Sequence, residues 1–239
     1  MERRLLLTGF VPWADVGENP AERVAQRLDG WRGGDLRVAG LVLPVAHVAA
    51  CASVAAAIRD LRPDAVLHLG LAAGRPALTV ECWAHNVLDF MLPDTAGAQP
   101  RLEPLREDGP PRQTTSFDVE AAVRALTAAG APAAPSATAG TYVCNAVFYR
   151  TLDWAATAGF AGPVGFIHLP TAETVSLADQ ERALEHLLCL LARARLDTRS
   201  STAAETAVEL RATVGDARPE HQTAGSRLAS TPARRRKPR

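Results

Sequence analysis

Three ionisable residues stand where an α/β protein commonly places reactive groups: Cys144, His168 and Glu81. Cys144 follows the small-residue segment 138–140 and opens a stretch with the pattern of a helix. The free N–H groups and the dipole at a helix start stabilise negative charge and lower the pKa of a thiol. The position of Cys144 therefore predicts a nucleophilic thiolate.

His168 and Glu81 are candidate partners of that thiol. His168 ends an apolar run, and Glu81 lies between the apolar Val80 and Cys82. A carboxylate inside an apolar strand costs free energy unless it is paired. In a thiol hydrolase a histidine shares its proton with the sulfur, and a carboxylate orients the imidazole. The three residue types together indicate a thiol hydrolase.

Each residue also has a purely structural interpretation. A single cysteine in an α/β protein is most often a core residue, and His168 could simply be hydrogen-bonded at the end of a strand. Glu81 could pair with Arg75 or cap a turn, and His85 lies close enough in sequence to be a second candidate partner of Glu81. The other histidines are interpreted as structural. Residue types and spacing alone leave both interpretations open.

Apolar strands alternate with amphipathic helices along most of the chain. Strands are expected over 3–10, 35–45, 63–72, 76–86 and 163–170, and helices over 20–30, 47–61, 117–130, 144–159 and 177–196. Asn19 before Pro20 predicts a capped helix start, and Ser176 with Asp179 predicts a capping box. This alternation predicts a three-layer α/β/α sandwich with a largely parallel, mixed central sheet, whose ligand sites lie beyond the carboxyl ends of parallel strands.

The chain of 239 residues is expected to form one α/β domain over 1–196 and a disordered basic tail over 197–239. The tail has few large apolar residues and cannot offset its chain entropy by burial. Residues 93–116 are predicted to be a long polar loop, of a length that tends to be functional. Formal net charge is +0, but the last ten residues hold five basic residues and no acidic one. The remainder is therefore mildly acidic, and a nucleic-acid partner is not expected.

No apolar run reaches the roughly 18 residues that span a bilayer. The N-terminal apolar run is too short for a signal peptide, so no membrane partner and a cytoplasmic location are expected. The cysteines show neither a CxxC motif nor a Cys/His ligand spacing. They are expected to be free thiols, with no metal site. They are Cys51, Cys82, Cys144 and Cys189.

Five blocks in the same order make the sequence similar to the pyroglutamyl peptidase I family, also called the pyrrolidone-carboxylate peptidases. The blocks, between residues 4 and 195, are LLTGFVPWADVGENP, RPDAVLHLGLAAGR, VECWAHNVLDFMLPDTAGAQP, TAGTYVCNAVFY and GFIHLP. The resemblance implies an α/β/α sandwich and a cysteine peptidase with Glu81, Cys144 and His168 as the catalytic residues. It implies removal of an N-terminal pyroglutamyl (5-oxoproline) residue through a thioester acyl-enzyme, without metal or cofactor. Family members are often homo-oligomers, which makes a dimer or tetramer a candidate assembly.

The resemblance also implies a substrate loop at GFVPW. Phe10 and Trp13 match aromatic residues that hold the lactam ring, and a neutral flat ring suits aromatic walls. Asn19 matches a family asparagine, although capping the following helix explains it equally well. These three residues are the candidate substrate-binding residues.

Some family positions differ in this chain. Residues 13–15 are Trp-Ala-Asp instead of Phe-Gly-Gly, Cys82 replaces an arginine, and Met91 replaces an arginine of the family's active site. The differences leave two alternatives open: a relative with an altered lactam or amide substrate, and a binding homologue without catalysis.

Overall fold

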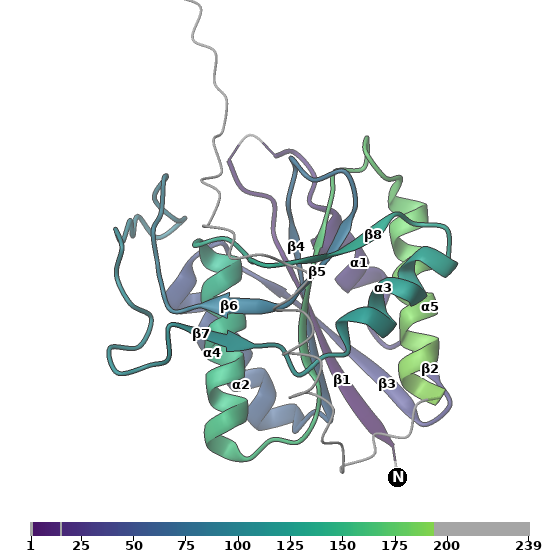
Figure 1. Ribbon diagram of the computed structural model, residues 1–239. Coiled ribbons are helices and arrows are strands. Elements are labelled where there is room, and N and C mark those ends of the chain that lie inside the picture. The colour runs from purple at the N-terminus through teal and green to yellow at the C-terminus, as the bar shows by residue number, and fades with distance from the viewer. Residues whose placement is uncertain (1, 15, 194–239) are drawn as a thin grey trace, which may run out of the picture.

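The computed structural model describes residues 2–14 and 16–193, which form a seven-stranded sheet between two layers of helices (Figure 1). The strands of this sheet are β1 Arg3–Phe10, β2 Arg32–Gly33, β3 Leu36–Leu43, β4 Ala65–Leu71, β5 Leu78–Glu81, β8 Ala133–Ser136 and β9 Val164–Leu169. A second, two-stranded sheet consists of β6 Trp83–His85 and β7 Arg112–Thr114. The helices are α1 Pro20–Arg27, α2 His47–Leu61, α3 Val119–Ala128, α4 Val143–Ala158 and α5 Leu177–Arg193. The predicted tail lies outside the described residues.

The large sheet has the strand order β2-β3-β1-β4-β9-β5-β8. The neighbours from β3 to β9 run parallel, whereas β5 runs antiparallel to β9 and β2 antiparallel to β3. Helices α1, α3 and α5 cover one face, and α2 and α4 cover the other (Figure 1). This arrangement confirms the predicted three-layer sandwich with a largely parallel, mixed sheet.

Strand β1 shows how the sequence builds two cores. Leu5 and Leu7 are buried against α1 and its neighbours, whereas Leu6 and Phe10 are buried with α2 and α4. Successive side chains of a strand point to opposite faces, so a run that is apolar at every position must be covered on both sides. None of the helices in the described part of the chain is long and apolar enough to cross a membrane.

Both predicted helix caps are confirmed. The Asn19 side-chain oxygen accepts a hydrogen bond from the N–H of Ala21 at 2.9 Å. The Ser176 hydroxyl accepts from the N–H of Asp179 at 3.2 Å and donates to the Asp179 carboxylate at 2.7 Å. These side chains satisfy N–H groups that a helix start otherwise leaves without partners.

The predicted strand over 76–86 is wrong in one respect, because the chain changes sheets at Cys82. The N–H of Cys82 donates to Ser136 at 2.7 Å, and its carbonyl accepts from Thr115 at 2.9 Å. Glu81 and Trp83 therefore lie in different sheets, so the alternation of one continuous strand does not place Glu81, Trp83 and His85 on a common face. The predicted loop over 93–116 contains β7, and the short strands β2 and β8 were not predicted.

Candidate active site

The antiparallel pairing of β5 with β9 brings Glu81 to His168. Thr79 lies opposite His168, so Glu81, two residues further on, points to the same face of the sheet. Glu81 Oε1 accepts a hydrogen bond from His168 Nδ1 at 2.7 Å, and both side chains are buried. An ionised carboxylate can only accept, which places the proton on Nδ1 and leaves Nε2 free to act as a base.

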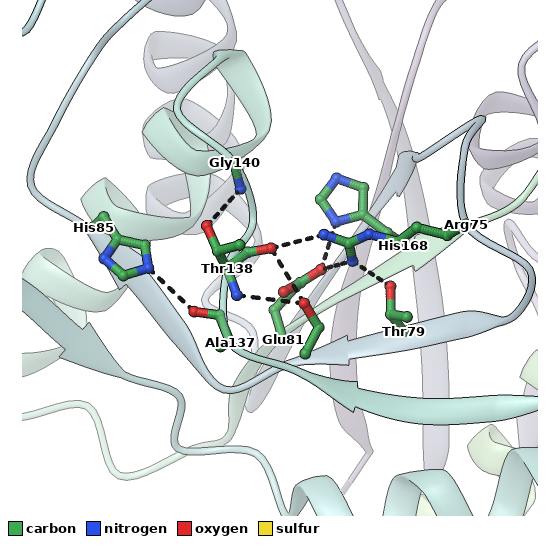
Figure 2. A network of polar contacts seen from close by, with 9 residues as sticks. Arg75, Thr79, Glu81, His85, Ala137, Thr138, Gly140 and His168 are labelled. Carbon is green, nitrogen blue, oxygen red and sulfur yellow. Dashed lines mark hydrogen bonds and ion pairs between the residues drawn. The ribbon is translucent and has the colours of Figure 1, made fainter. Parts of the chain in front are cut away.

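Arg75 is a second partner of the same carboxylate oxygen. Its Nη1 donates to Glu81 Oε1 at 2.5 Å and also contacts the Thr79 hydroxyl, and its Nη2 donates to the Thr138 carbonyl at 2.8 Å (Figure 2). Glu81 Oε2 has no hydrogen-bond partner among the described residues. Glu81 is therefore a hydrogen-bond partner of both His168 and Arg75, which the sequence left as alternatives.

Cys144 lies in the first turn of α4, across Gly70 from His168. Tyr142 caps this helix without a side-chain hydrogen bond, which leaves N–H groups of the first turn without a capping side chain. A methyl group placed on Gly70 would lie 2.9 Å from Cys144 Sγ and 3.0 Å from His168 Cδ2. The sulfur and the ring therefore approach the same point, and the fold brings all three candidate residues together.

The protonation of the site differs from the expected thiolate. Burial raises the pKa of the Cys144 thiol to about 12; the charge of Glu81 raises it further, and that of Arg75 opposes the rise. Burial also lowers the pKa of His168, against the effect of Glu81. Cys144 keeps part of its surface accessible, yet protein atoms enclose the sulfur closely enough for desolvation to outweigh the helix start. The resting site therefore holds a neutral thiol beside a neutral imidazole.

The aromatic residues of the substrate loop lie at two depths. The Trp13 ring lies 5.0 Å from that of Tyr142, which directly precedes α4, and Tyr142 lies 4.4 Å from Phe90. Phe10 is buried in the core at 3% exposure. Trp13 thus belongs to an aromatic wall next to the helix that carries Cys144, whereas Phe10 lies beneath it.

The comparison with known proteins settles the family. A model of the pyroglutamyl peptidase family matches residues 3–198. The chain belongs to this family.

The chain is 43% identical over 169 residues to the pyrrolidone-carboxylate peptidase of Cupriavidus pinatubonensis, covering 70% of this chain and 78% of that protein. The corresponding peptidase of Pyrococcus furiosus is 37% identical over 167 residues, with 70% and 80% covered. The crystal structure of Bacillus amyloliquefaciens pyroglutamyl peptidase I matches with a TM-score of 0.77 and 31% identity, covering 81% of this chain and 98% of that one.

Two residues that flank Cys144 in the candidate site were not predicted from the sequence. Tyr142 is one, and an aromatic residue two positions before the cysteine was its signal. Asn145 is the other: its side chain accepts from the His85 N–H at 2.8 Å and donates to the carbonyls of His85 and Val87 at 2.8 and 3.0 Å. This buried amide ties β6 to α4 next to Cys144. Its signal was a polar residue within an apolar helical stretch.

His85 is excluded as the partner of Glu81. Its Nε2 lies 3.1 Å from the Ala137 carbonyl (Figure 2). Its backbone N–H donates to the Asn145 side chain. His68, interpreted as structural, is fully buried between the hydroxyls of Thr8 and Thr151 at 2.8 and 3.1 Å. Burial lowers the pKa of His68 to about 3, which keeps it neutral.

The positions that differ from the family have distinct surroundings. The Met91 side chain is 55% exposed, whereas Cys82 is buried, and burial raises the pKa of its thiol to about 11. Ala14, at a family glycine position, has φ +56°, a conformation that favours glycine. Asp15 lies outside the described residues. The loop therefore keeps a glycine-like backbone at Ala14 although the residue has changed.

No group of three or more His, Cys, Asp or Glu residues that could hold a metal ion occurs in the described ranges. A surface hollow of about 420 Å³ has Trp154 and Phe160 in its lining. Trp154 lies ten residues along α4 from Cys144, a rise of about 15 Å. This hollow therefore lies apart from the candidate active site.

Both the oxygen and the nitrogen of the Asn19 side-chain amide form hydrogen bonds with the backbone. Besides capping α1, it donates to the Val11 carbonyl at 3.3 Å and so tethers the loop that carries Trp13. We expect Asn19→Ala to lower the free energy of unfolding by about 1 kcal/mol through the lost cap. Because the loop loses its tether, we also expect a several-fold higher KM with a nearly unchanged kcat. Chemical denaturation and steady-state kinetics measure both.

Asp118→Ala is the matched control for this prediction. Asp118 caps α3 by accepting from the N–H of Ala121 at 2.9 Å. Two residues before Asp118, the Ser116 hydroxyl accepts a hydrogen bond from the N–H of Val164. Val164 is the first residue of β9 and lies at the opposite end of this strand from His168. The control should lose similar stability and keep its KM. A KM that rises equally in both variants would mean that Asn19 acts as a helix cap alone.

Proposed function

We propose that this chain is a cysteine peptidase that hydrolyses the amide bond after an N-terminal pyroglutamyl residue of peptides, with Cys144 as nucleophile, His168 as base and Glu81 as the orienting acid. The observation that carries the proposal is the position of His168, whose ring meets Cys144 across Gly70 and whose Nδ1 donates to Glu81. Membership of the pyroglutamyl peptidase family and relatives named pyrrolidone-carboxylate peptidase support the substrate. The alternatives of an altered substrate and of a binding homologue are not favoured by these relatives.

Because the resting thiol is neutral, proton transfer accompanies the attack. His168 Nε2 takes the proton of Cys144 as the sulfur forms a bond to the carbonyl carbon of the pyroglutamyl residue. The negative charge that develops on the carbonyl oxygen is stabilised by first-turn N–H groups of α4, where the helix dipole also favours it. Glu81 stabilises the imidazolium that forms.

Breakdown of this intermediate releases the peptide. The imidazolium gives its proton to the leaving amine as the C–N bond breaks, which leaves a thioester between Cys144 and the pyroglutamyl group. His168 then takes a proton from water as the water oxygen attacks the thioester carbon. The C–S bond breaks to release 5-oxoproline, and the imidazolium returns its proton to the leaving sulfur, which restores the neutral thiol and the neutral imidazole. Each step uses only groups of the chain, the substrate and water.

Trp13 and Tyr142 are proposed to hold the lactam ring. Their rings flank the start of α4, and aromatic faces suit a flat, neutral ring whose orientation a few polar groups then fix. Phe10 is proposed to shape the substrate loop from the core, and Asn19 to tether it. Under this proposal Trp13 and Tyr142 contact the substrate, while Phe10 and Asn19 support the loop.

A series of aminocoumarin amides tests the proposed specificity. The reduced protein is expected to release fluorophore from the pyroglutamyl amide but not from the prolyl or glutaminyl amide, because prolyl is a charged amine without the lactam carbonyl and glutaminyl has no ring. A well-folded protein without activity on the pyroglutamyl amide would contradict the proposal. Equal rates on the prolyl amide would show that the lactam is not what the site recognises.

The pH dependence of kcat/KM follows from the protonation of His168. Only the neutral imidazole can accept the proton of Cys144, and burial lowers the pKa of His168 below its usual 6.5. Activity is therefore expected to persist below pH 6.5 and to be lost as the pH falls through this lowered pKa. A pH profile of kcat/KM on the pyroglutamyl amide measures this, and an acid limb at or above the usual histidine value would contradict it.

A homo-oligomeric assembly, a dimer or tetramer, and a cytoplasmic location are further parts of the proposed function. Neither enters the chemistry above, since all three proposed catalytic residues come from one chain. Light scattering coupled to size-exclusion chromatography determines the assembly, and a monomer at working concentrations would contradict that part.

A further inference from the structure

We propose that Arg75 is a positioning residue of this active site, which acts through Glu81 and through the loop that leads to Cys144. The inference rests on the proposed peptidase function. Arg75 lies between β4 and β5 and is not one of the three residues that carry out the chemistry. Its guanidinium group contacts both Glu81 and the carbonyl of Thr138, in the loop before α4.

A single guanidinium group spans the carboxylate and the nucleophile loop. Nη1 donates at 2.5 Å to Glu81 Oε1, the same oxygen that accepts from His168 at 2.7 Å, while Nη2 donates at 2.8 Å to the Thr138 carbonyl (Figure 2). The guanidinium is planar and holds its donors in a fixed fork. It therefore fixes the distance between Glu81 and Thr138, and with it the setting of His168 relative to the loop.

The loop itself is built from short turns that end at α4. The Thr138 N–H donates to the Ser136 hydroxyl at 3.3 Å, which donates back to the Thr138 carbonyl at 3.2 Å, and the Gly140 N–H donates to the Thr138 hydroxyl at 3.0 Å. Gly140 has φ +78°, which glycine adopts without strain, and α4 begins at Val143. Arg75 therefore holds the loop at a residue whose own contacts define the approach to Cys144.

The charge of Arg75 also acts on both reacting groups. The titratable and charged groups that face His168 are Glu81 from β5, Arg75 from the preceding loop and Cys144 from α4, while β4 contributes the uncharged Gly70. After burial, Glu81 raises the pKa of both His168 and Cys144, and Arg75 lowers both. Arg75 thus balances the carboxylate, so that Glu81 orients the imidazole without making it strongly basic.

Two substitutions separate the charge of Arg75 from its geometry. Arg75→Met removes both, and we expect kcat to fall about 10- to 100-fold with a smaller change in KM, because the reacting groups lose their alignment. The acid limb of kcat/KM should move to higher pH, since a positive charge that lowers the pKa of His168 is gone. Arg75→Lys keeps the charge but cannot hold two acceptors in one plane. It should lower kcat and leave the acid limb in place.

Arg106→Met is the matched control. Arg106 forms a half-buried ion pair with Asp153 on α4, away from the three proposed catalytic residues. Its loss should leave kcat and the acid limb as in the wild type. The double variant Arg75→Met with Glu81→Gln tests whether Arg75 acts through Glu81. If it does, Arg75→Met lowers kcat by a smaller factor in the Glu81→Gln background than in the wild type.

A readout without turnover separates this inference from the proposed function. The pH dependence of Cys144 alkylation by iodoacetamide should shift to higher pH in Arg75→Met, whatever the substrate of the protein is. A folded Arg75→Met variant with unchanged alkylation and acid limb would assign Arg75 a merely structural role and overturn the proposal. If Arg75→Met does not fold, Arg75→Lys decides, and wild-type kcat in that variant would overturn it. Absence of turnover in the wild type would instead refute the peptidase function.

Discussion

Replacing Gly70 by alanine is expected to lower kcat/KM by about 100-fold or more, because a methyl group would stand between the nucleophile and its base. It would lie 2.9 Å from Cys144 Sγ, 2.9 Å from Phe166 Cζ and 3.0 Å from His168 Cδ2. Real carbon atoms do not approach so closely, so the sulfur and the ring must move apart. The backbone of Gly70 does not have a positive φ, and alanine is therefore unfavourable there only because of these neighbours.

Gly74→Ala is the matched control for this experiment. A methyl group at Gly74 meets no atom within 4 Å, and the residue does not have a positive φ. The control should keep wild-type activity, whereas Gly70→Ala is also expected to lose about 1–3 kcal/mol of stability through overpacking. Steady-state kinetics and denaturant unfolding measure both variants. A folded Gly70→Ala protein with near wild-type turnover would show that the thiol and the imidazole do not react across this glycine.

Glu81→Gln is expected to lower kcat by about 100- to 10,000-fold while preserving most of the geometry. Oε1 already accepts from both His168 and Arg75, and Oε2 has no partner among the described residues. The amide can keep its oxygen at Oε1 and place its NH2 group at Oε2, so the charge is lost rather than the contacts. The imidazolium that forms during attack then lacks its counter-charge.

The acid limb gives this substitution a distinct signature. Glu81 raises the pKa of His168, so its neutralisation should move the acid limb to lower pH, opposite to Arg75→Met. Arg75 also loses its charged partner, and we expect the free energy of unfolding to fall by about 1–3 kcal/mol. Glu120→Gln, which breaks the exposed ion pair with Arg124, is the control without effect on kcat. A loss of less than about tenfold in Glu81→Gln would contradict the assigned role.

Much of the fold could be predicted because its signals are local. The apolar run of β1 encodes burial on two faces, and Asn19 and Ser176 cap their helices through contacts within three residues. The break at Cys82 could not be predicted in this way, because its backbone partners, Ser136 and Thr115, lie far away in sequence. The antiparallel register of β5 and β9 likewise depends on tertiary pairing.

The site was predictable to a similar extent. The chemistry of Cys144, His168 and Glu81 singled them out, and the resemblance to the family assigned their roles. Sequence reasoning gave His168 and Arg75 as alternative partners of Glu81, whereas one oxygen accepts from both. The helix start suggested a lowered pKa for Cys144, but side chains from several elements enclose the sulfur and reverse the direction. Such enclosure is a property of the packed structure and is absent from any local pattern.

The most direct test of the account is the release of fluorophore from pyroglutamyl-aminocoumarin amide by the wild type and by Cys144→Ser under reducing conditions. Cys51→Ser and Cys189→Ser, which change the other half-buried thiols, are the matched controls. We predict turnover in the wild type and both controls, and a loss of about 1,000-fold or more in Cys144→Ser. Wild-type turnover in a Cys144→Ser protein would contradict the central claim that this thiol is the nucleophile.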